Sequence, residues 1–483
     1  QYDNMESLIV TPEQIYNEFS SGRQDISAIR DFCRMLYEKS DSSNMPSYLL
    51  LFGDGSYDPK DRNGVLANYI PAFQSKESLK LGYSFVTDDF YGLYDPNEGN
   101  NAYAKSLDIG IGRLPANNEE QAKDMVDKIE RYLSKSDNVM GEWRNKICFV
   151  ADDEDQNTHF KQAEELAAIF DTSRVYNLNK VYLDAYPQVS TPSGHRYPEV
   201  NTAINNVIND GLLIFNYTGH GGEYGLAHEK VLDIGMINSW TNRNSLPLFI
   251  AATCEFSRFD DPKITSAGEW VLLNPDGGSI GLYTTTRLAW SDPNFKFNKI
   301  IYENAFKIID GEYQRLGDMM RIAKTRMNSS QNIKNIVLLG DPALQLAYPK
   351  HWVETDSIVK QDLTSANDTI LAMASITVYG GIEDLDGNSL EDFNGKLYST
   401  VYDKEIRNQT LGNDGGSYPA YFHLQSSELY KGISTIKDGK FEFSFVVPKD
   451  IAYDYGNGKI SYYAYDTLTY DDAHGYENAL VGG

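Results

Sequence analysis

The chain has 483 residues, about three times the length of an average single domain, so we expect two or three domains and a large buried core. Its 69 acidic side chains outnumber the 43 basic ones and give a formal net charge of −26. This charge repels phosphate backbones and argues against nucleic acid as a partner. A hydrophobic content of 41% fits an ordered globular chain and argues against disorder. No apolar run approaches the roughly 18 residues of a membrane span.

Short apolar runs alternate with helix-period segments up to about residue 348, which is the pattern of a mainly parallel sheet covered by helices. The expected strands are residues 7–10, 48–53, 107–111, 146–151, 174–177, 212–218, 246–253, 279–284 and 335–339. The expected helices are residues 25–38, 119–133, 160–170, 197–209, 295–309 and 317–327. In residues 119–133 the apolar side chains recur every three or four positions, which predicts one buried stripe.

After residue 349 the pattern changes to alternating β-rich segments with Asp-Gly and Asn-Gly turn signals between them, at residues 370–379, 396–403, 440–447 and 459–466. This pattern predicts an immunoglobulin-like β-sandwich. We therefore expect an N-terminal α/β subdomain at 1–140, a catalytic α/β subdomain at 141–349 and the sandwich at 350–483. The first two should share one interface or one continuous sheet.

Reactive residues follow two of the expected strands. One strand runs into the glycine-rich segment NYTGHGGE (216–223), which contains His220, and another ends on Cys254. Ligands collect at the carboxyl ends of parallel strands. A cysteine nucleophile needs a base and backbone donors for the oxyanion, and the amides of Gly221 and Cys254 are suited to the second task. Together these residues predict an acyl-transfer site.

Structural interpretations compete with this one. A lone cysteine is usually a small buried hydrophobe, as we expect for Cys33 and Cys148, and a lone histidine is usually structural. The residues alone therefore leave both interpretations about equally open. The three cysteines have no metal-like spacing, so we predict neither a metal site nor a disulfide framework. Acidic clusters at 54–61 and 88–95 leave calcium open as a structural ion, with solvated turns favoured.

Several motifs resemble one peptidase family. Residues 216–223 and 246–254 resemble the catalytic histidine and cysteine segments of the gingipain-type cysteine peptidases, the C25 family. GRLPA at 112–116, residues 279–290 and LGDPAL at 339–344 extend the resemblance in the family's order, over about residues 6–348. It implies a caspase-like α/β fold of two subdomains, with a mainly parallel sheet and helices on both faces, and no required cofactor.

The resemblance also implies roles for single residues. Cys254 would be the nucleophile and His220 its general base and later acid. The amides of Gly221 and Cys254 would form the oxyanion hole. Trp290 matches a tryptophan that lines the gingipain substrate pocket, with plain packing as the alternative.

The resemblance is weaker for two other features. Asp153 is nearest to the family's acidic position that orients the histidine, with Asp152 as a rival. Gingipains that cleave after arginine use an acidic residue in a segment that here has the sequence NTHF (157–160). The resemblance therefore does not imply specificity for arginine.

Within the family, residues 10–22, 283–295 and 440–463 are most similar to the sortase-like signal peptidases of the type IX secretion system. This similarity implies a cysteine endopeptidase or transpeptidase that removes C-terminal secretion signals from exported proteins. The new C-terminus would pass to an amine of cell-surface lipopolysaccharide, with outer-membrane secretion proteins as partners. We expect a location at the bacterial cell surface and more chain before residue 1.

For this first hypothesis, the acyl-enzyme has two fates open to it, hydrolysis and transfer to an amine. Two other hypotheses compete with it. A catalytically silent C25-like module that binds secreted cargo is a second hypothesis, which the intact His220 and Cys254 oppose. A general secreted cysteine protease is a third, which the likeness of the terminal segments to the signal peptidases disfavours.

Overall fold

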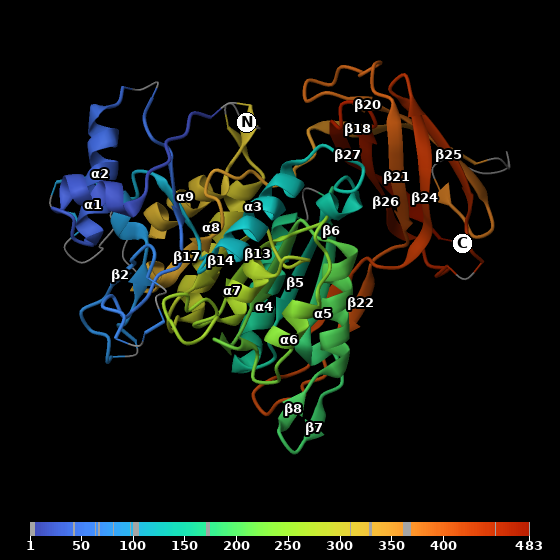
Figure 1. The fold of residues 1–483 in the computed structure, drawn as a ribbon. Coiled ribbons are helices and arrows are strands. Elements are labelled where there is room, and N and C mark those ends of the chain that lie inside the picture. The colour runs from blue at the N-terminus through green and yellow to red at the C-terminus, as the bar shows by residue number, and fades with distance from the viewer. Residues whose placement is uncertain are drawn as a thin grey trace.

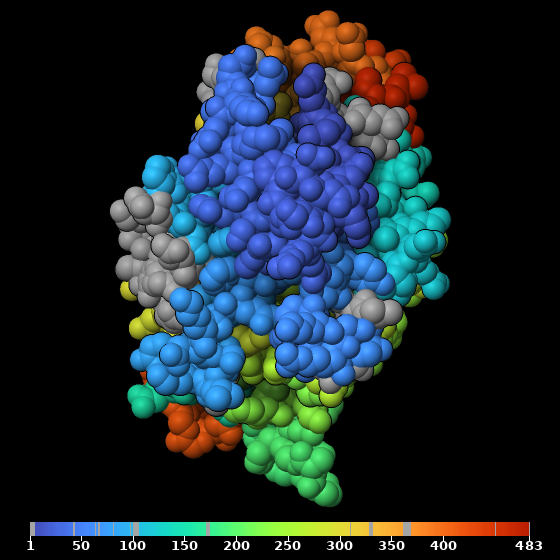
Figure 2. All heavy atoms as spheres, turned by 60° about the vertical axis from the view of Figure 1, so that its left-hand side comes forward, coloured from blue at the N-terminus to red at the C-terminus, as the bar shows by residue number. Residues whose placement is uncertain are grey.

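A computed structural model places an N-terminal region, a central α/β layer and a C-terminal β domain side by side (Figure 1). The central layer lies between the other two, and the N-terminal region gathers on one side of the molecule (Figure 2). The residues that the structure describes are 5–41, 44–62, 64–65, 68–80, 82–96, 98–99, 106–170, 174–309, 311–327, 331–360, 369–449 and 451–482. Within these ranges no helix is long and apolar enough to cross a membrane.

The central layer is one eight-stranded sheet with the order β1-β4-β17-β14-β13-β9-β5-β6. All neighbouring strands are parallel except β14 and β17, which are antiparallel. The sheet therefore runs unbroken through both predicted α/β halves. The strands are β1 (Tyr48–Phe52), β4 (Gly110–Leu114), β5 (Lys146–Ala151), β6 (Asn177–Tyr182), β9 (Ile214–Thr218), β13 (Leu248–Ala252), β14 (Gly281–Thr285) and β17 (Ile336–Leu339).

Helices cover both faces of this sheet, as the sequence predicts. Alternate residues of β5 pack into two separate apolar cores, with Phe149 in one and Val150 in the other. Side chains of α4 (Thr158–Ala167), α8 (Ser291–Ala305) and α9 (Leu316–Met327) fill the first core. The second core takes side chains from α3 (Glu119–Leu133), α5 (Pro198–Asp210), α6 (Ile234–Ser239) and α7 (Ala267–Leu273). Residues buried on both sides explain the continuous apolar strands.

The strand predicted at residues 7–10 is wrong, because this stretch is irregular. The first element is instead α1 (Pro12–Phe19), which begins with a capping box between Thr11 and Gln14 and has Pro12 in its first turn. It packs on α2 (Ile26–Lys39). These capping residues are local helix signals that outweigh a short apolar run.

The GRLPA motif has a structural role at its arginine. Arg113 is fully buried on β4, donates two hydrogen bonds to the Asp88 carboxylate and donates further bonds to the carbonyls of Gly53 and Ile70. Asp89 pairs with the buried Lys324 in the same way. Cations of the chain therefore neutralise two carboxylates of the acidic cluster at 88–95.

The C-terminal domain is rich in β-structure, as predicted. Its main strands follow one another in a single sheet that closes on itself through a pairing of the first with the last long strand. This continuous sheet differs from the two separate sheets of the predicted sandwich. Its strands are β18 (His351–Lys360), β19 (Thr369–Ile370), β20 (Ser375–Glu383), β21 (Gly395–Tyr402), β24 (Glu428–Lys437), β25 (Lys440–Val446), β26 (Gly456–Asp466) and β27 (Asp472–Val481).

One hairpin of the C-terminal domain reaches the central layer (Figure 1). It consists of β22 (Ile406–Gln409) and β23 (Tyr421–Leu424), and Phe422 joins the first core of the central sheet. The Asp184 carboxylate accepts from the amides of Gly412 and Asn413, at 2.8 and 2.7 Å. The connecting loop is thereby fixed beside the carboxyl ends of the central strands. Other short strands are β2 (Phe73–Gln74), β3 (Val86–Thr87), β7 (Val189–Thr191), β8 (Gly194–Arg196), β15 (Ile308–Ile309) and β16 (Glu312–Tyr313).

Candidate active site

The predicted histidine and cysteine follow neighbouring parallel strands. Thr218 of β9 lies opposite Ala252 of β13, and two residues further along each chain are His220 and Cys254. The glycine after His220 allows a close approach to Thr253, because a Cβ on Gly221 would lie 2.6 Å from Oγ1 of that residue. The sheet topology therefore brings both reactive residues to one edge.

The backbone of His220 is firmly held. Its amide donates to the Asp152 carboxylate at 2.8 Å, and the Tyr217 hydroxyl donates to its carbonyl at 2.6 Å. The preceding Gly219 packs so closely on Asp152 that an added Cβ would lie 2.4 Å from the Cβ of that residue. A glycine at this position is needed for that close approach.

Two carboxylates face the imidazole ring of His220. Nε2 lies 3.1 Å from Oδ2 of Asp155 and 3.4 Å from Oε2 of Glu154. A neutral imidazole that donates from Nε2 has its free lone pair on Nδ1. Nδ1 is therefore the ring nitrogen that is able to accept a proton.

Two further imidazoles flank this ring. His228 stacks on it with ring centroids 5.2 Å apart, and His159 meets it edge to face at 5.3 Å. A hydrogen bond with Glu154 raises the pKa of His228, whereas burial lowers the pKa of His159.

Asp155 owes its position to a strained turn. Asp155, Gln156 and Asn157 are three consecutive residues with φ of 57°, 56° and 60°, in the left-handed region that side chains other than glycine rarely adopt. The Asn157 side chain donates to the carbonyl of Tyr418 at 2.7 Å and accepts from its amide at 3.0 Å. The loop between β22 and β23 thus supports the turn from outside, as strain at a functional site requires.

The predicted orienting acid, Asp153, lies elsewhere. Its carboxyl group accepts a hydrogen bond from the Tyr197 hydroxyl, and burial raises its pKa to about 9. In the part of the chain that the structure describes, no hydrogen bond or ion pair joins this carboxyl group to the His220 ring. Its rival Asp152 binds the backbone of His220 instead of the ring. The charged groups on the ring are Asp155 and Glu154, which the sequence analysis did not single out.

The thiol of Cys254 is half-buried and touches the segment that precedes α8. Sγ donates to the carbonyl of Ala289 at 3.2 Å and accepts from the amide of that residue at 3.4 Å. Burial raises the pKa of the Cys254 thiol. Among the described residues no hydrogen bond joins this sulfur to the His220 ring, so proton transfer requires the two side chains to approach each other.

The other two cysteines are unsuited to catalysis. Both lie in apolar cores, Cys33 on α2 and Cys148 on β5. Burial raises the pKa of Cys33 to about 11 and that of Cys148 further. A thiolate is the reactive form, so only the half-buried Cys254 has the access that a nucleophile needs.

The remaining predicted site residues are the amides of Gly221 and Cys254 and the side chain of Trp290. Within the described chain, the amide of Cys254 donates to no backbone carbonyl, so it is free to bind an oxyanion. Gly221 lies in the short strand β10 (Gly221–Gly222), which pairs with β11 (Gly225–Leu226), and β12 (Leu232–Asp233) follows beside it. Trp290 follows Ala289 directly and is 69% exposed. An aromatic ring this exposed is available to a ligand.

Comparison with known proteins identifies the family. The model of peptidase family C25 matches residues 1–347. The chain belongs to this family. Gingipain R1 of Porphyromonas gingivalis is 24% identical over 371 residues, which is 73% of this C25 chain but only 32% of the relative. The chain therefore spans about a third of the length of that relative.

Solved structures agree at the level of the fold. The crystal structure of the arginine-specific cysteine proteinase gingipain R aligns over 96% of this chain and 90% of its own, with a TM-score of 0.54 and 18% identity. This likeness confirms the predicted α/β fold of a gingipain-like C25 cysteine peptidase. Dimeric latent PorU from the same organism aligns over 97% of this chain and 39% of its own, with a TM-score of 0.44 and 23% identity.

Proposed function

We propose that Cys254 and His220 are the catalytic pair of a cysteine peptidase. His220 accepts the thiol proton at Nδ1, and the sulfur attacks the carbonyl carbon of a peptide bond. The amides of Gly221 and Cys254 bind the resulting oxyanion. His220 then gives its proton to the leaving amine, and a thioester remains on Cys254. The observation behind this proposal is the parallel pairing of β9 and β13, which brings both residues to one edge of the sheet.

Asp155 orients the base in this mechanism, because its carboxylate is 3.1 Å from Nε2. We expect Asp155→Asn to lower kcat by roughly a hundredfold, since the ring loses the charge that stabilises the imidazolium. Asp153→Asn is the matched control and should change kcat little, because Asp153 is bound to Tyr197. Steady-state kinetics of the two purified variants makes the comparison. A larger loss in Asp153→Asn would assign the orienting role to Asp153.

We infer the substrate class from sequence resemblance. Segments 10–22, 283–295 and 440–463 resemble the sortase-like signal peptidases of type IX secretion. We therefore propose that the enzyme removes C-terminal signals from exported proteins at the bacterial cell surface. Transfer of the new C-terminus to a lipopolysaccharide amine, beside outer-membrane secretion proteins, completes this proposal.

Arginine specificity is not part of the proposal. The segment NTHF at 157–160 lacks an acidic residue, and His159 within it is buried. The indole of Trp290 is exposed and follows Ala289, whose backbone contacts the nucleophile, so it is instead suited to form an apolar wall of the P1 pocket.

Mass spectrometry distinguishes transfer from hydrolysis. A substrate with a C-terminal secretion signal and an N-terminal tag is incubated with the protein and a soluble amine. We expect a tagged product that is heavier than the hydrolysis product by the mass of the amine less one water, in a fraction that rises with amine concentration. Hydrolysis alone at high amine would remove the transferase proposal, and an uncut substrate would remove the signal peptidase proposal. The Cys254→Ala protein is the control for both.

A further inference from the structure

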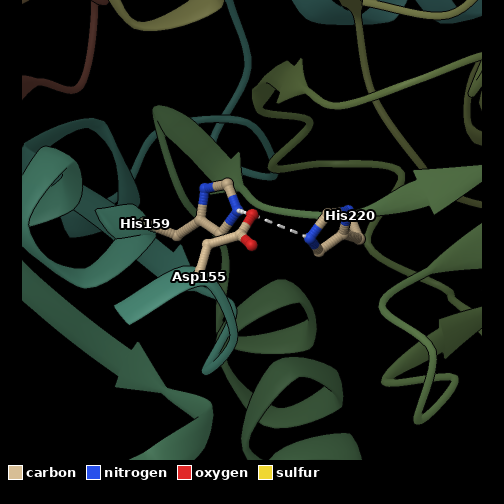
Figure 3. Close-up of side chains that lie close together, drawn as sticks. All are labelled: Asp155, His159 and His220. Carbon is tan, nitrogen blue, oxygen red and sulfur yellow. Dashed lines mark hydrogen bonds and ion pairs between the residues drawn. The ribbon is translucent and has the colours of Figure 1, made fainter. Parts of the chain in front are cut away.

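Asp155, His159 and His220 converge on one point next to the proposed catalytic pair (Figure 3). One ligand atom from each of the three residues lies within 4.8 Å of the other two. Oδ2 of Asp155 is 3.1 Å from Nε2 of His220 and 3.4 Å from Nε2 of His159. The carboxylate therefore lies between two imidazole rings.

His159 has an unusual environment for a structural histidine. Its side chain is only 5% exposed, and neither ring nitrogen has a hydrogen-bond partner among the described residues. Nε2 approaches the Asp155 carboxylate at 3.4 Å without the geometry of a hydrogen bond. Buried polar atoms are nearly always satisfied by a partner, a water or an ion, so this nitrogen indicates an additional ligand.

The spacing of the three atoms fits a tetrahedral metal ion. Zinc binds imidazole nitrogen at about 2.0–2.1 Å and carboxylate oxygen at about 2.0–2.2 Å, so neighbouring ligand atoms of a tetrahedral site are about 3.3–3.5 Å apart. The Asp155 oxygen is 3.1 and 3.4 Å from the two imidazole nitrogens, and all three ligand atoms lie within 4.8 Å of one another. Two imidazoles favour zinc and related transition metals, whereas calcium prefers a shell of oxygen atoms.

We propose that Asp155, His159 and His220 form an inhibitory site for Zn²⁺, with water as the fourth ligand. Inhibition by zinc rests on the proposed function, in which His220 is the base of the catalytic pair. Zinc binding itself does not. The carboxylate of Asp155 is 56% exposed, which gives the ion a path from solvent. Two carboxylates near the ring, Asp155 and Glu154, favour the approach of a cation.

A metal on Nε2 inhibits because it determines which ring nitrogen carries the hydrogen. Neutral imidazole has one nitrogen-bound hydrogen, and a metal on Nε2 places that hydrogen on Nδ1. His220 is then unable to accept the thiol proton of Cys254. Asp155 becomes a metal ligand in the same step and no longer orients the ring. No bond of the chain is made or broken, so removal of the ion restores both groups.

Direct binding is measured in the Cys254→Ala protein, which excludes the thiol as a ligand. Calorimetric titration with Zn²⁺ should show one site, and His159→Phe in this background should weaken it about a hundredfold or more, because a direct ligand is lost. His228→Phe is the matched control. The His228 ring also stacks on His220, but it is not one of the three convergent residues, so its loss should leave zinc affinity unchanged. His159→Gln serves if the phenylalanine variant does not fold.

Inhibition is measured in protein that retains Cys254. The ratio of activity without zinc to activity with zinc should be large in the parent and in His228→Phe, and close to one in His159→Phe. A chelator should restore the activity of the inhibited proteins. A Cys254→Ala protein that binds no zinc, or equal zinc affinity in His159→Phe and its parent, would overturn the site. If the parent binds zinc at these residues but cleaves no peptide, the proposed function fails and the metal site stands.

Discussion

Cys254→Ala should lower peptide cleavage by about 10³-fold or more and leave the fold unchanged. Activity falls because the substitution removes the half-buried thiol that serves as the nucleophile. The fold is kept because alanine is smaller than cysteine and is easily accommodated after β13. Cleavage is followed with a peptide substrate, and folding is checked by thermal unfolding.

Cys33→Ala is the matched control for this result. Cys33 lies in the N-terminal core on α2, so its loss should affect stability more than turnover. Undiminished activity in Cys254→Ala, or an equal loss in both variants, would show that Cys254 is not the nucleophile.

His220→Ala should lower kcat/KM by about 10²- to 10⁴-fold, because no other described imidazole directly follows β9. Burial raises the pKa of the Cys254 thiol, so without a base the thiolate must form by loss of the proton to solvent. Residual activity should therefore rise about tenfold per pH unit below that pKa. A pH profile of kcat/KM for both proteins measures this.

The control for this variant is His228→Ala. His228 stacks on His220 and bonds to Glu154, but it lies on the solvent side, with a side chain that is 68% exposed. Its removal should alter kcat/KM much less than the loss of His220. If both variants lose equal activity and keep the parent's pH profile, the base is another group.

The sequence predicted best those strands of the central sheet that are buried on both faces. The strands expected at 107–111 and 174–177 overlap β4 and β6 by only two residues and one residue. Continuous apolar runs such as residues 146–151 and 212–218 have few alternatives to a buried parallel strand. The apolar stripe of residues 119–133 likewise matches α3. The positions of His220 and Cys254 followed from the same logic, since parallel strands end at one edge.

The loops were harder to predict, because distant residues determine their conformation. Asp155 reaches the His220 ring through a left-handed turn that the contact between Asn157 and Tyr418 holds in place. Tyr418 is 261 positions after Asn157 in the chain. No local pattern indicates that contact. Position along the chain predicts Asp153 as the orienting acid, but its carboxyl group accepts a hydrogen bond from Tyr197 of a different segment. The closure of the C-terminal sheet through β18 and β27 is a long-range pairing of the same kind.

A crystal structure of the protein with a peptide aldehyde bound to Cys254 tests the central claim most directly. The aldehyde forms a thiohemiacetal whose oxygen occupies the place of the oxyanion. We predict that Nδ1 of His220 lies within about 4 Å of Sγ, with the amides of Gly221 and Cys254 directed at that oxygen. An imidazole that faces a different pocket, more than about 7 Å from the sulfur, would contradict the catalytic pair.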